Sequence, residues 1–421
     1  MTKLLDHVLQ SYVASAEQGS FNGVRADLAL LACGLDVASV AEIVVLVESR
    51  DLDCVFASVD LNPYIKRLTA LSPPDQIERL NVEPLGSVCL YPTVELLARE
   101  VSPEMCRDAP FSRALLLGGA QLDHVGFDLA VLGRYRSDPR FNLTFEDYVG
   151  TMSVTGGAYE DADFPERDKI SIQSFGLGFD REGFPHVVAF LRYLANLTPE
   201  HQQYWNSFRT SGEVQICEPY YRSSIIGDFW SNQSVRHAIE EEMRLINEMA
   251  VAAFGKPFFR HLLSPALPFD LSSFLVPSTD NYEKFVHSWD KMLSDNIDKK
   301  FFAGLIAGER EEERADGKIV VVQKGTLSLL REWLELRIHG NSSKRLVDAI
   351  VAPLQKIRRE RQAPAHRFSE NAFSKDFHEQ RRKVLWSIYE SLTTLREVMS
   401  RQPGAEIVRA PDWLREGLDV I

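Results

Sequence analysis

The last third of the chain contains four consecutive segments in which apolar residues recur every three or four positions. This spacing places the apolar side chains on one face of a helix, and such helices must bury that face against one another. Short polar stretches separate the segments, so the sequence predicts an up-and-down bundle of four helices. The apolar stripes are Phe285, Trp289, Met292 and Ile297; Leu327, Leu330, Leu334 and Ile338; residues within 344–360; and Phe377, Leu385, Ile388, Leu392 and Leu395.

The third predicted helix, residues 344–360, has recognisable end signals. Asn341, Ser342 and Ser343 precede it, and such residues are favoured at helix N-caps. Pro353 lies inside it and predicts a bend, because proline has no N–H and clashes with the preceding turn. The acidic run 309–316, between the first and second helices, is predicted to be a loop.

The first 70 residues show another helical pattern. Residues 4–16, 26–35 and 38–48 have helical spacing, and residues 53–61 look like a small β-hairpin. Three helices followed by such a wing resemble a winged-helix domain. Residues 1–150 contain 12 Lys and Arg against 21 Asp and Glu, and this negative balance opposes contact with a DNA duplex.

The middle of the chain is predicted to be mixed α and β. Residues 170–175 form a β-like run, the glycines within 175–180 predict a turn, and a helix is expected to begin near Pro185. Residues 199–253 have mainly helical spacing, ended by Gly255. The Gly-rich and acidic stretch 155–165 is the best candidate for a boundary.

The length of 421 residues also predicts several folded units, because single domains usually contain about 100–150 residues. We predict a multidomain, mainly α chain of the α+β type. Its predicted parts are a winged-helix-like domain at 1–70, a helical extension at 71–155, a mixed α/β domain at 156–275 and the helical bundle at 276–421.

Charge and cysteine content narrow the possible settings. The net charge is −13, whereas residues 341–402 hold 13 Lys and Arg against 7 Asp and Glu, so the basic surface is C-terminal. The five cysteines are scattered and form no Cys-x-x-Cys pair, which predicts reduced core thiols, not disulfides or a zinc site. No apolar run reaches the ~18 residues of a membrane span, and the N-terminus has no signal-peptide pattern, so we expect a cytoplasmic protein.

A basic run leads into a histidine between the third and fourth predicted helices: Arg358-Arg-Glu-Arg361-Gln362-Ala-Pro-Ala-His366. The spacing Arg-x4–6-His, with a polar residue after the Arg and the last helix of a bundle following, resembles the HEPN superfamily of RNA-cutting and nucleotide-binding domains. Arg361, Gln362 and His366 take the three positions, although Gln362 stands where Asn or Asp is commoner. The resemblance covers only the C-terminal third of the chain.

Short motifs of this kind also occur by chance, and about two matches are expected among ten histidines. One further match pairs Arg359 with the same His366, and another joins Arg181 to His186 in a Gly- and Pro-containing turn. The bundle, the position before its last helix and the local basic charge favour Arg361 with His366.

Metal-independent RNA cleavage explains why these residue types suit the task. A ribose 2′-OH must lose its proton as it attacks the neighbouring phosphate, and His366 titrates in the range that a general base or acid needs. Arg361 carries a permanent charge that can stabilise the phosphorane oxygens. The resemblance implies 2′,3′-cyclic phosphate and 5′-OH ends, no metal or other cofactor, and a homodimer of facing bundles.

Other residues are assigned supporting roles. Asp290 and Asp295, predicted on the first bundle helix, could orient Arg361 or His366, or could be ordinary solvated charges. The candidate contacts to the RNA backbone are Arg358, Arg359, Arg367, Arg381 and Arg382.

Two function classes stay open from the sequence. The first is an endoribonuclease of a toxin or antiphage-defence type, with N-terminal domains that sense or regulate and a possible protein trigger. The second is a non-enzymatic protein that dimerises or binds a nucleotide, in which Arg361 only pairs at a helix end. A transcription regulator is disfavoured, because the helix 38–48 contains Glu42 and Glu48.

Overall fold

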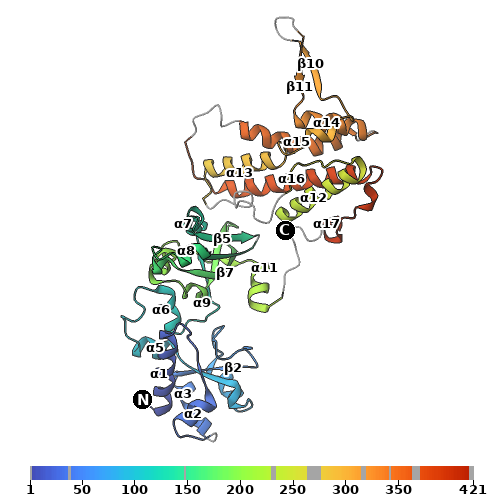
Figure 1. The fold of residues 1–421 in the computed structure, drawn as a ribbon. Coiled ribbons are helices and arrows are strands. Elements are labelled where there is room, and N and C mark those ends of the chain that lie inside the picture. The colour runs from blue at the N-terminus through green and yellow to red at the C-terminus, as the bar shows by residue number, and fades with distance from the viewer. Residues whose placement is uncertain are drawn as a thin grey trace. The chain divides into compact units, whose positions relative to one another are not determined.

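The computed structural model divides into two compact units, Met1–Asp228 and Phe229–Ile421, which we call the N-terminal and C-terminal units (Figure 1). Both contain helices and strands, so the predicted mixture of α and β structure is confirmed at this coarse level. No helix in the described part of the chain is long and apolar enough to cross a membrane. The structure describes residues 2–36, 39–146, 148–228, 234–262, 276–313, 319–340, 343–362 and 370–416.

Helices and a three-stranded antiparallel sheet with the strand order β1-β3-β2 form the first part of the N-terminal unit. Helices occur at the three predicted positions, and their apolar faces pack with the sheet into one core. The predicted hairpin over 53–61 is wrong, because β2 pairs with β3 beyond α4 while residues 57–61 form a turn. The resemblance to winged-helix domains stays a prediction. The elements are α1 (Lys3–Glu17), β1 (Val24–Arg25), α2 (Ala26–Ala32), α3 (Val40–Glu48), β2 (Leu52–Phe56), α4 (Pro73–Leu80) and β3 (Val88–Pro92).

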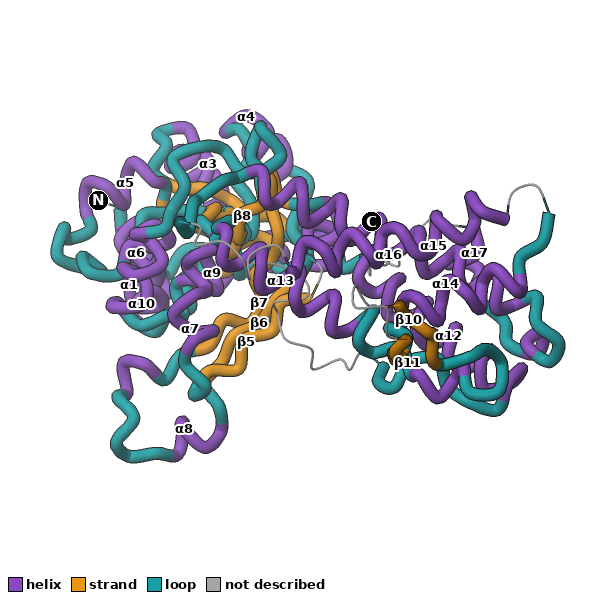
Figure 2. Tube along the Cα trace, turned by 90° about the horizontal axis from the view of Figure 1, so that it is seen from above, coloured by secondary structure: helices purple, strands orange, loops and turns teal. Residues whose placement is uncertain are grey.

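A six-stranded antiparallel sheet forms the centre of the rest of this unit (Figure 2). Its strand order is β4-β8-β7-β6-β5, and β9 pairs with one end of β7. Since β6 and β7 pair across residue 155, the predicted boundary at that residue is wrong. The strands are β4 (His124–Phe127), β5 (Phe141–Glu146), β6 (Val149–Val154), β7 (Ser171–Phe179), β8 (Pro185–Phe190) and β9 (Gln215–Ile216).

Two local predictions in this sheet are also wrong. The glycines of 175–180 lie inside β7, not in a turn, and Gly176 is needed because an added Cβ would lie 2.1 Å from the Tyr220 ring. The helix expected near Pro185 is strand β8, whose central residues are buried between neighbouring strands and helices. A continuous apolar run does not by itself distinguish a buried strand from a buried helix.

Short helices surround this sheet. Residues 71–155, predicted to be a mainly helical extension, also contain β3, β4, β5 and β6, so that prediction is wrong in part. The stretch 155–165, predicted to be a domain boundary, begins with helix α8, which is capped by the Thr155 hydroxyl. The helices are α5 (Val94–Glu100), α6 (Pro110–Leu116), α7 (Gly133–Ser137), α8 (Gly156–Glu160), α9 (Leu191–Leu194), α10 (Pro199–Ser207) and α11 (Glu218–Tyr221).

The C-terminal unit is a helical bundle with helices at the four predicted positions (Figure 1). The fold differs from the prediction in one major element, since the long helix α12 packs against α16 within the same core. The predicted boundary at 275 is therefore wrong. The helices are α12 (Val235–Phe254), α13 (Thr279–Met292), α14 (Thr326–Arg337), α15 (Ser343–Gln362), α16 (Asp376–Ser400) and α17 (Asp412–Glu416). Pro353 lies inside α15 as predicted, while the predicted caps Asn341 and Ser342 lie outside the described residues.

A buried ion pair joins α12 to α16. Arg396 Nε lies 2.7 Å from Glu242 Oε2, and the Thr393 hydroxyl donates to Glu242 Oε1 at 2.9 Å. Burial raises the pKa of Glu242, and the bonds from Arg396 and Thr393 oppose that rise. Because an unpaired charge in this position would be costly, an alignment of α12 and α16 that separated the pair would be disfavoured.

A two-stranded arm extends from the bundle beside α14 (Figure 1). β10 (Glu309–Glu313) pairs antiparallel with β11 (Ile319–Gln323), with Glu311 opposite Val321. The predicted acidic loop is thus a strand over 309–313. A run rich in Glu has little tendency to form a strand alone, and here the partner strand of β-branched residues supplies the pairing.

Candidate functional site

The candidate site lies where the end of α13 meets the end of α15 in the C-terminal unit. The hydroxyl of Ser278 caps the start of α13 by accepting from the Asn281 N–H. One face of α13 buries Phe285 and Trp289, and Asp290 follows on that face with 0% of its surface exposed. Burial of an ionised carboxylate is unfavourable without a partner, so Asp290 needs cationic or hydrogen-bonding residues opposite it.

A tight turn after α13 brings a second carboxylate to the same place. Asp295 was predicted to lie on the first bundle helix, and this prediction is wrong because the helix ends at Met292. The Asp295 N–H donates to the Asp290 carbonyl at 3.1 Å, which folds the chain back over the helix end. The Asn296 side chain anchors the turn with two hydrogen bonds to the backbone of His261. Its Oδ1 accepts from the His261 N–H at 2.9 Å, and its Nδ2 donates to the His261 carbonyl at 2.7 Å.

Two arginines of α15 meet these carboxylates. Arg358 and Arg361 are three residues apart, so they project from the same side of the helix. Arg361 Nη1 lies 2.7 Å from Asp290 Oδ2 and 2.6 Å from Asp295 Oδ2. Arg358 Nη2 lies 2.6 Å from Asp295 Oδ1, and its Nε lies 3.4 Å from Asp290 Oδ1. We call these four residues the Asp–Arg cluster.

The cluster is electrically balanced but unevenly exposed. Two carboxylates face two guanidinium groups, and the side chains of Asp295 and Arg361 are 42% and 29% exposed. Hydrogen bonds to Asp295 and then Asp290 raise the pKa of Arg361, so its charge is permanent. Asp290 Oδ1 is buried and has no hydrogen bond within the described residues.

Only one nitrogen of Arg361 has a contact within the described residues. Both of its carboxylate contacts use Nη1, and within the described part of the chain no contact uses Nε or Nη2. Arg358, in contrast, turns both Nη2 and Nε toward the carboxylates. The cluster therefore holds Arg361 in one orientation while leaving part of its hydrogen-bonding capacity open.

The remaining residues of the predicted site differ in exposure. Gln362, the last residue of α15, and Arg359 and Arg382 are exposed. Arg358 was predicted to contact RNA phosphates but is instead engaged by carboxylates. Arg381 is half-buried, and desolvation lowers the pKa of its guanidinium to about 10. His366 and Arg367 lie outside the described residues.

A tyrosine beside the cluster was missed by the sequence analysis. The Tyr282 hydroxyl donates to Glu360 Oε2 at 3.2 Å, and its ring stacks on Phe377 at a centroid distance of 5.1 Å. Burial and the neighbouring Glu360 raise the pKa of Tyr282, so its hydroxyl stays protonated. The only sequence signal was its helical spacing with Phe285, which marks a core-facing position without naming a partner.

The second Arg-x4-His match lies in the N-terminal unit and is built differently. Arg181 is exposed and contacts Glu213 at 2.9 Å, whereas His186 lies 3.2 Å from Asp180. His186 also lines an open hollow together with Arg209. Arg181 and His186 each contact a different carboxylate, so this match does not reproduce the Asp–Arg cluster.

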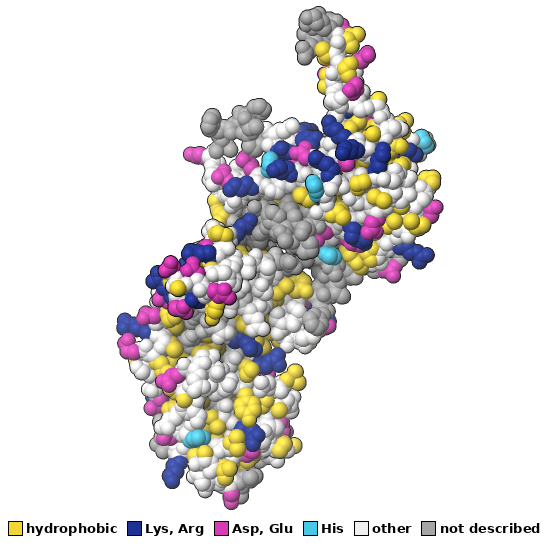
Figure 3. Space-filling model, in the orientation of Figure 1, with side chains coloured by type: hydrophobic (Ala, Val, Ile, Leu, Met, Phe, Trp, Pro, Cys, Tyr) yellow, Lys and Arg dark blue, Asp and Glu magenta, His cyan; other side chains and the backbone are white. Residues whose placement is uncertain are grey.

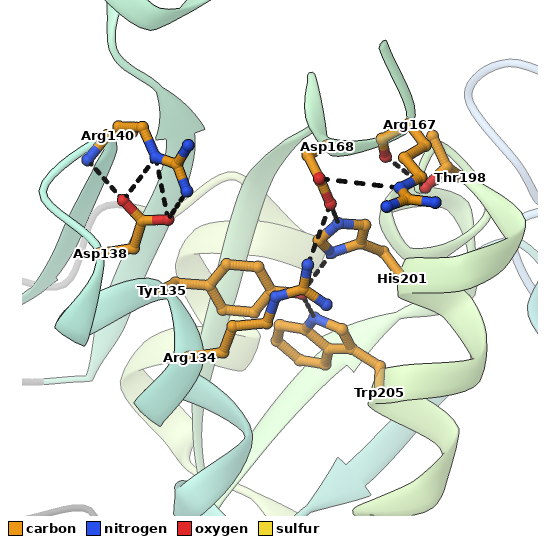
Figure 4. A network of polar contacts seen from close by, with 9 residues as sticks. All are labelled: Arg134, Tyr135, Asp138, Arg140, Arg167, Asp168, Thr198, His201 and Trp205. Atoms are coloured by element: carbon orange, nitrogen blue, oxygen red, sulfur yellow. Dashed lines mark hydrogen bonds and ion pairs between the residues drawn. The ribbon is translucent and has the colours of Figure 1, made fainter. Parts of the chain in front are cut away.

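Buried His201 in the N-terminal unit is the centre of a different polar network (Figure 4). His201 Nε2 lies 2.8 Å from Asp168 Oδ1, and its Nδ1 lies 2.7 Å from the Tyr135 hydroxyl. Trp205 Nε1 donates to that hydroxyl at 3.0 Å, and Arg134 Nη2 donates to Asp168 at 2.9 Å. His201, Tyr135 and Trp205 are fully buried and bonded, so the network links α7, α10 and the loop before β7 and its three ring-bearing members are closed to a substrate.

The cysteines agree only in part with the predicted core thiols. Cys54 and Cys89 are buried, while Cys33, Cys106 and Cys217 are half-buried, and all five are free. Burial raises the pKa of Cys89 to about 12, so this thiol is unreactive. Within the described residues no group of three or more His, Cys, Asp and Glu is arranged to hold a metal ion.

We compared the chain with models of protein families, with curated proteins and with solved structures, and none of the three comparisons found a match. A function for this chain is therefore inferred from the Asp–Arg cluster and the residues around it.

Proposed function

We propose that the C-terminal unit is a metal-independent endoribonuclease of the HEPN type, with Arg361 and His366 as its catalytic residues. The observation that carries the proposal is the state of Arg361. Two carboxylates hold its Nη1, while Nε and Nη2 have no contact in the described residues and its side chain is partly exposed. A preorganised cation with spare donors is what a developing negative charge requires.

The proposed reaction is an attack by the ribose 2′-oxygen on the adjacent phosphate, with proton transfers by protein side chains and no metal ion. The 2′-oxygen of the ribose attacks the adjacent phosphorus, the bond from phosphorus to the 5′-oxygen breaks, and a cyclic phosphate results. His366 removes the 2′-OH proton or supplies a proton to the leaving 5′-oxygen. Arg361 donates hydrogen bonds to the phosphoryl oxygens as their charge increases. Gln362, exposed beside Arg361, would orient the phosphate.

RNA binding would draw on the exposed cations near the cluster. Arg359 and Arg382 have exposed side chains, and they lie on α15 and α16. Exposed guanidinium groups bind phosphates and carry no sequence information by themselves. The acidic N-terminal unit would then sense or regulate, as expected of a cytoplasmic toxin or antiphage-defence nuclease that must stay off bulk RNA.

The test is cleavage of a mixed RNA pool in the presence of EDTA. Wild type should cut and leave 2′,3′-cyclic phosphate ends, and Arg361→Ala and His366→Ala should not. Arg181→Ala is the matched control, because it removes the arginine of the other Arg-x4-His match at an exposed position. Cleavage that survives His366→Ala, or that the control removes equally, contradicts the proposal.

A second candidate function is a non-enzymatic interaction protein. The observation in its favour is the charge balance of the Asp–Arg cluster. Its ion pairs join α15 to α13, and this structural role requires no substrate. In that case Arg361→Ala would lower the stability of the C-terminal unit, and wild type would neither cut nor bind RNA. Circular dichroism during urea unfolding, together with an RNA-binding titration, separates the two functions.

A further inference from the structure

The arm carries an uncovered apolar surface beside an acidic one. The pairing register places Ile319 and Val321 of β11 on the same face as Glu309, Glu311 and Glu313 of β10. Ile319 is 66% exposed and Val321 is 63% exposed. We call these five residues the arm face.

A two-stranded sheet with exposed aliphatic side chains is unusual when no other surface covers it. The sheet contains only β10 and β11, and two-stranded hairpins are at best marginally stable without a covering surface. Exposed aliphatic side chains on such a pair also favour association. A partner that covers Ile319 and Val321 would bury surface that the described chain leaves in solvent.

A complementary surface exists on α15 of the same unit. Arg345, Ala349, Ala352, Lys356 and Arg359 are all exposed and follow one another at helical spacing, so they form one stripe, the α15 face. Lys and Arg side chains gather over α14 and α15 in the space-filling view (Figure 3). The α15 face therefore has small apolar residues at its centre and cations at its ends.

Among the cations of the α15 face, Lys356 is partly offset by an ion pair with Glu360. Asp348 is paired with Arg331 at 2.9 Å, and Glu360 accepts from Tyr282 and lies 3.8 Å from Lys356. Within the described residues, no carboxylate contacts Arg345 or Arg359.

The two faces also match in length. At about 3.4 Å per residue, the acids from Glu309 to Glu313 span roughly 14 Å. At 1.5 Å per residue, Arg345 and Lys356 are about 16 Å apart along α15. Val321, which is paired with Glu311 in the middle of this row, would thus lie over Ala349 and Ala352, whose small side chains permit close approach.

We propose that the arm face of one chain docks on the α15 face of a second copy of the chain, and that the second copy returns the same contact. Both faces are exposed in the single chain, so both are accessible to a second copy. A two-fold arrangement satisfies both pairs at once. A nucleic acid does not fit the arm face, since phosphates would be repelled by its glutamates.

This inference does not rest on ribonuclease activity, and both faces lie outside the Asp–Arg cluster. Arg359, at one end of the α15 face, is the one residue that it shares with the proposed RNA contact, so the docking variants leave Arg359 unchanged. Each contact is small and partly electrostatic, so we expect a dimer that depends on concentration and weakens with salt. Sedimentation velocity of the full chain at 0.1 and 1 M NaCl measures this directly. A wild type that is monomeric at every concentration overturns the proposal.

Charge reversal identifies the contact. Arm variant E309K/E311K/E313K should be monomeric, because its arm repels the α15 face of its partner. The α15 variant R345E/K356E should be monomeric for the same reason. An equimolar mixture of the two variants should form the dimer again, since each arm then meets an opposite charge on the other chain.

The control reverses two exposed acids elsewhere in the same unit, E390K/E397K, which should leave the dimer intact. Circular dichroism checks that each variant is folded. Variants that stay dimeric when alone, or a mixture that stays monomeric, overturn the proposal. The first of these results would instead indicate a dimer through the facing bundles implied by the HEPN resemblance.

Discussion

The polar network around His201 and the Asp–Arg cluster use similar groups in opposite ways. In the N-terminal unit, His201 is buried and both of its ring nitrogens have partners. In the C-terminal unit, Arg361 is partly exposed and keeps donors without a contact in the described residues. A buried group whose hydrogen bonds are all formed supports the structure, whereas a group that is held in place with donors still available can act on a ligand.

The largest expected effect separates the two arginines of the cluster. Arg361→Ala should lower RNA cleavage by roughly 10²–10³-fold, as loss of a preorganised donor to the transition state does elsewhere. Arg358→Ala should have a smaller effect, because Arg358 faces the carboxylates with its donors and acts only by positioning. Initial rates at saturating RNA measure both. Equal losses would remove the distinction drawn between them.

Next in size is the contrast between the two carboxylates. Asp290→Asn should lower the free energy of unfolding of the C-terminal unit by on the order of 3 kcal/mol, because Asp290 is fully buried beside two guanidinium groups. Asp295→Asn should cost about 1 kcal/mol or less, because water screens that partly exposed group. Urea unfolding followed by circular dichroism checks the order. A larger loss for Asp295→Asn would contradict the assignment.

Removing one hydroxyl tests the other region. Tyr135→Phe leaves the Trp205 N–H and one His201 nitrogen without their partner, so the N-terminal unit should lose about 1–3 kcal/mol of stability. RNA cleavage by the folded protein should not change. Tyr159→Phe is the matched control, since Tyr159 is 61% exposed. A loss of cleavage with unchanged stability would argue against a purely structural network.

The smallest effect is a pH dependence. Burial lowers the pKa of His201, and the bond to Asp168 opposes only part of that shift. The unfolded chain therefore binds a proton near the ordinary pKa of about 6.5 while the folded chain does not. The contribution of His201 to the free energy of unfolding should be fully present above that pH. It should decrease as the pH falls toward the pKa of His201 in the folded chain.

Thermal unfolding between pH 7.5 and 5 measures this dependence. In His201→Gln the unfolding temperature should be lower overall, but its decrease between pH 6.5 and 5 should be smaller than in wild type. The same pH slope in both proteins would show that other groups cause the loss.

Local patterns predicted much of the C-terminal unit. The repeat of apolar residues was enough for α13, α14, α15 and α16, because each helix shows its buried face in its own sequence. The same reasoning failed for β8 and for the glycines of β7, where pairing with distant strands decides the structure. For the candidate site, the sequence indicates Asp290, Asp295 and Arg361 as residues of interest. It does not give the distances between them.

Helical faces, the basic character of residues 341–402 and the spacing of Arg358, Arg361 and His366 can all be read from the sequence alone. The burial of Asp290, the turn that carries Asp295 back to it, and the contact of both with Arg361 depend on the packing of the helices. These two sets of features differ in the sequence distance over which they are set. Helical periodicity is set by neighbours three or four residues apart, whereas these ion pairs join residues 71 and 66 positions apart, whose contact depends on how α13 packs against α15.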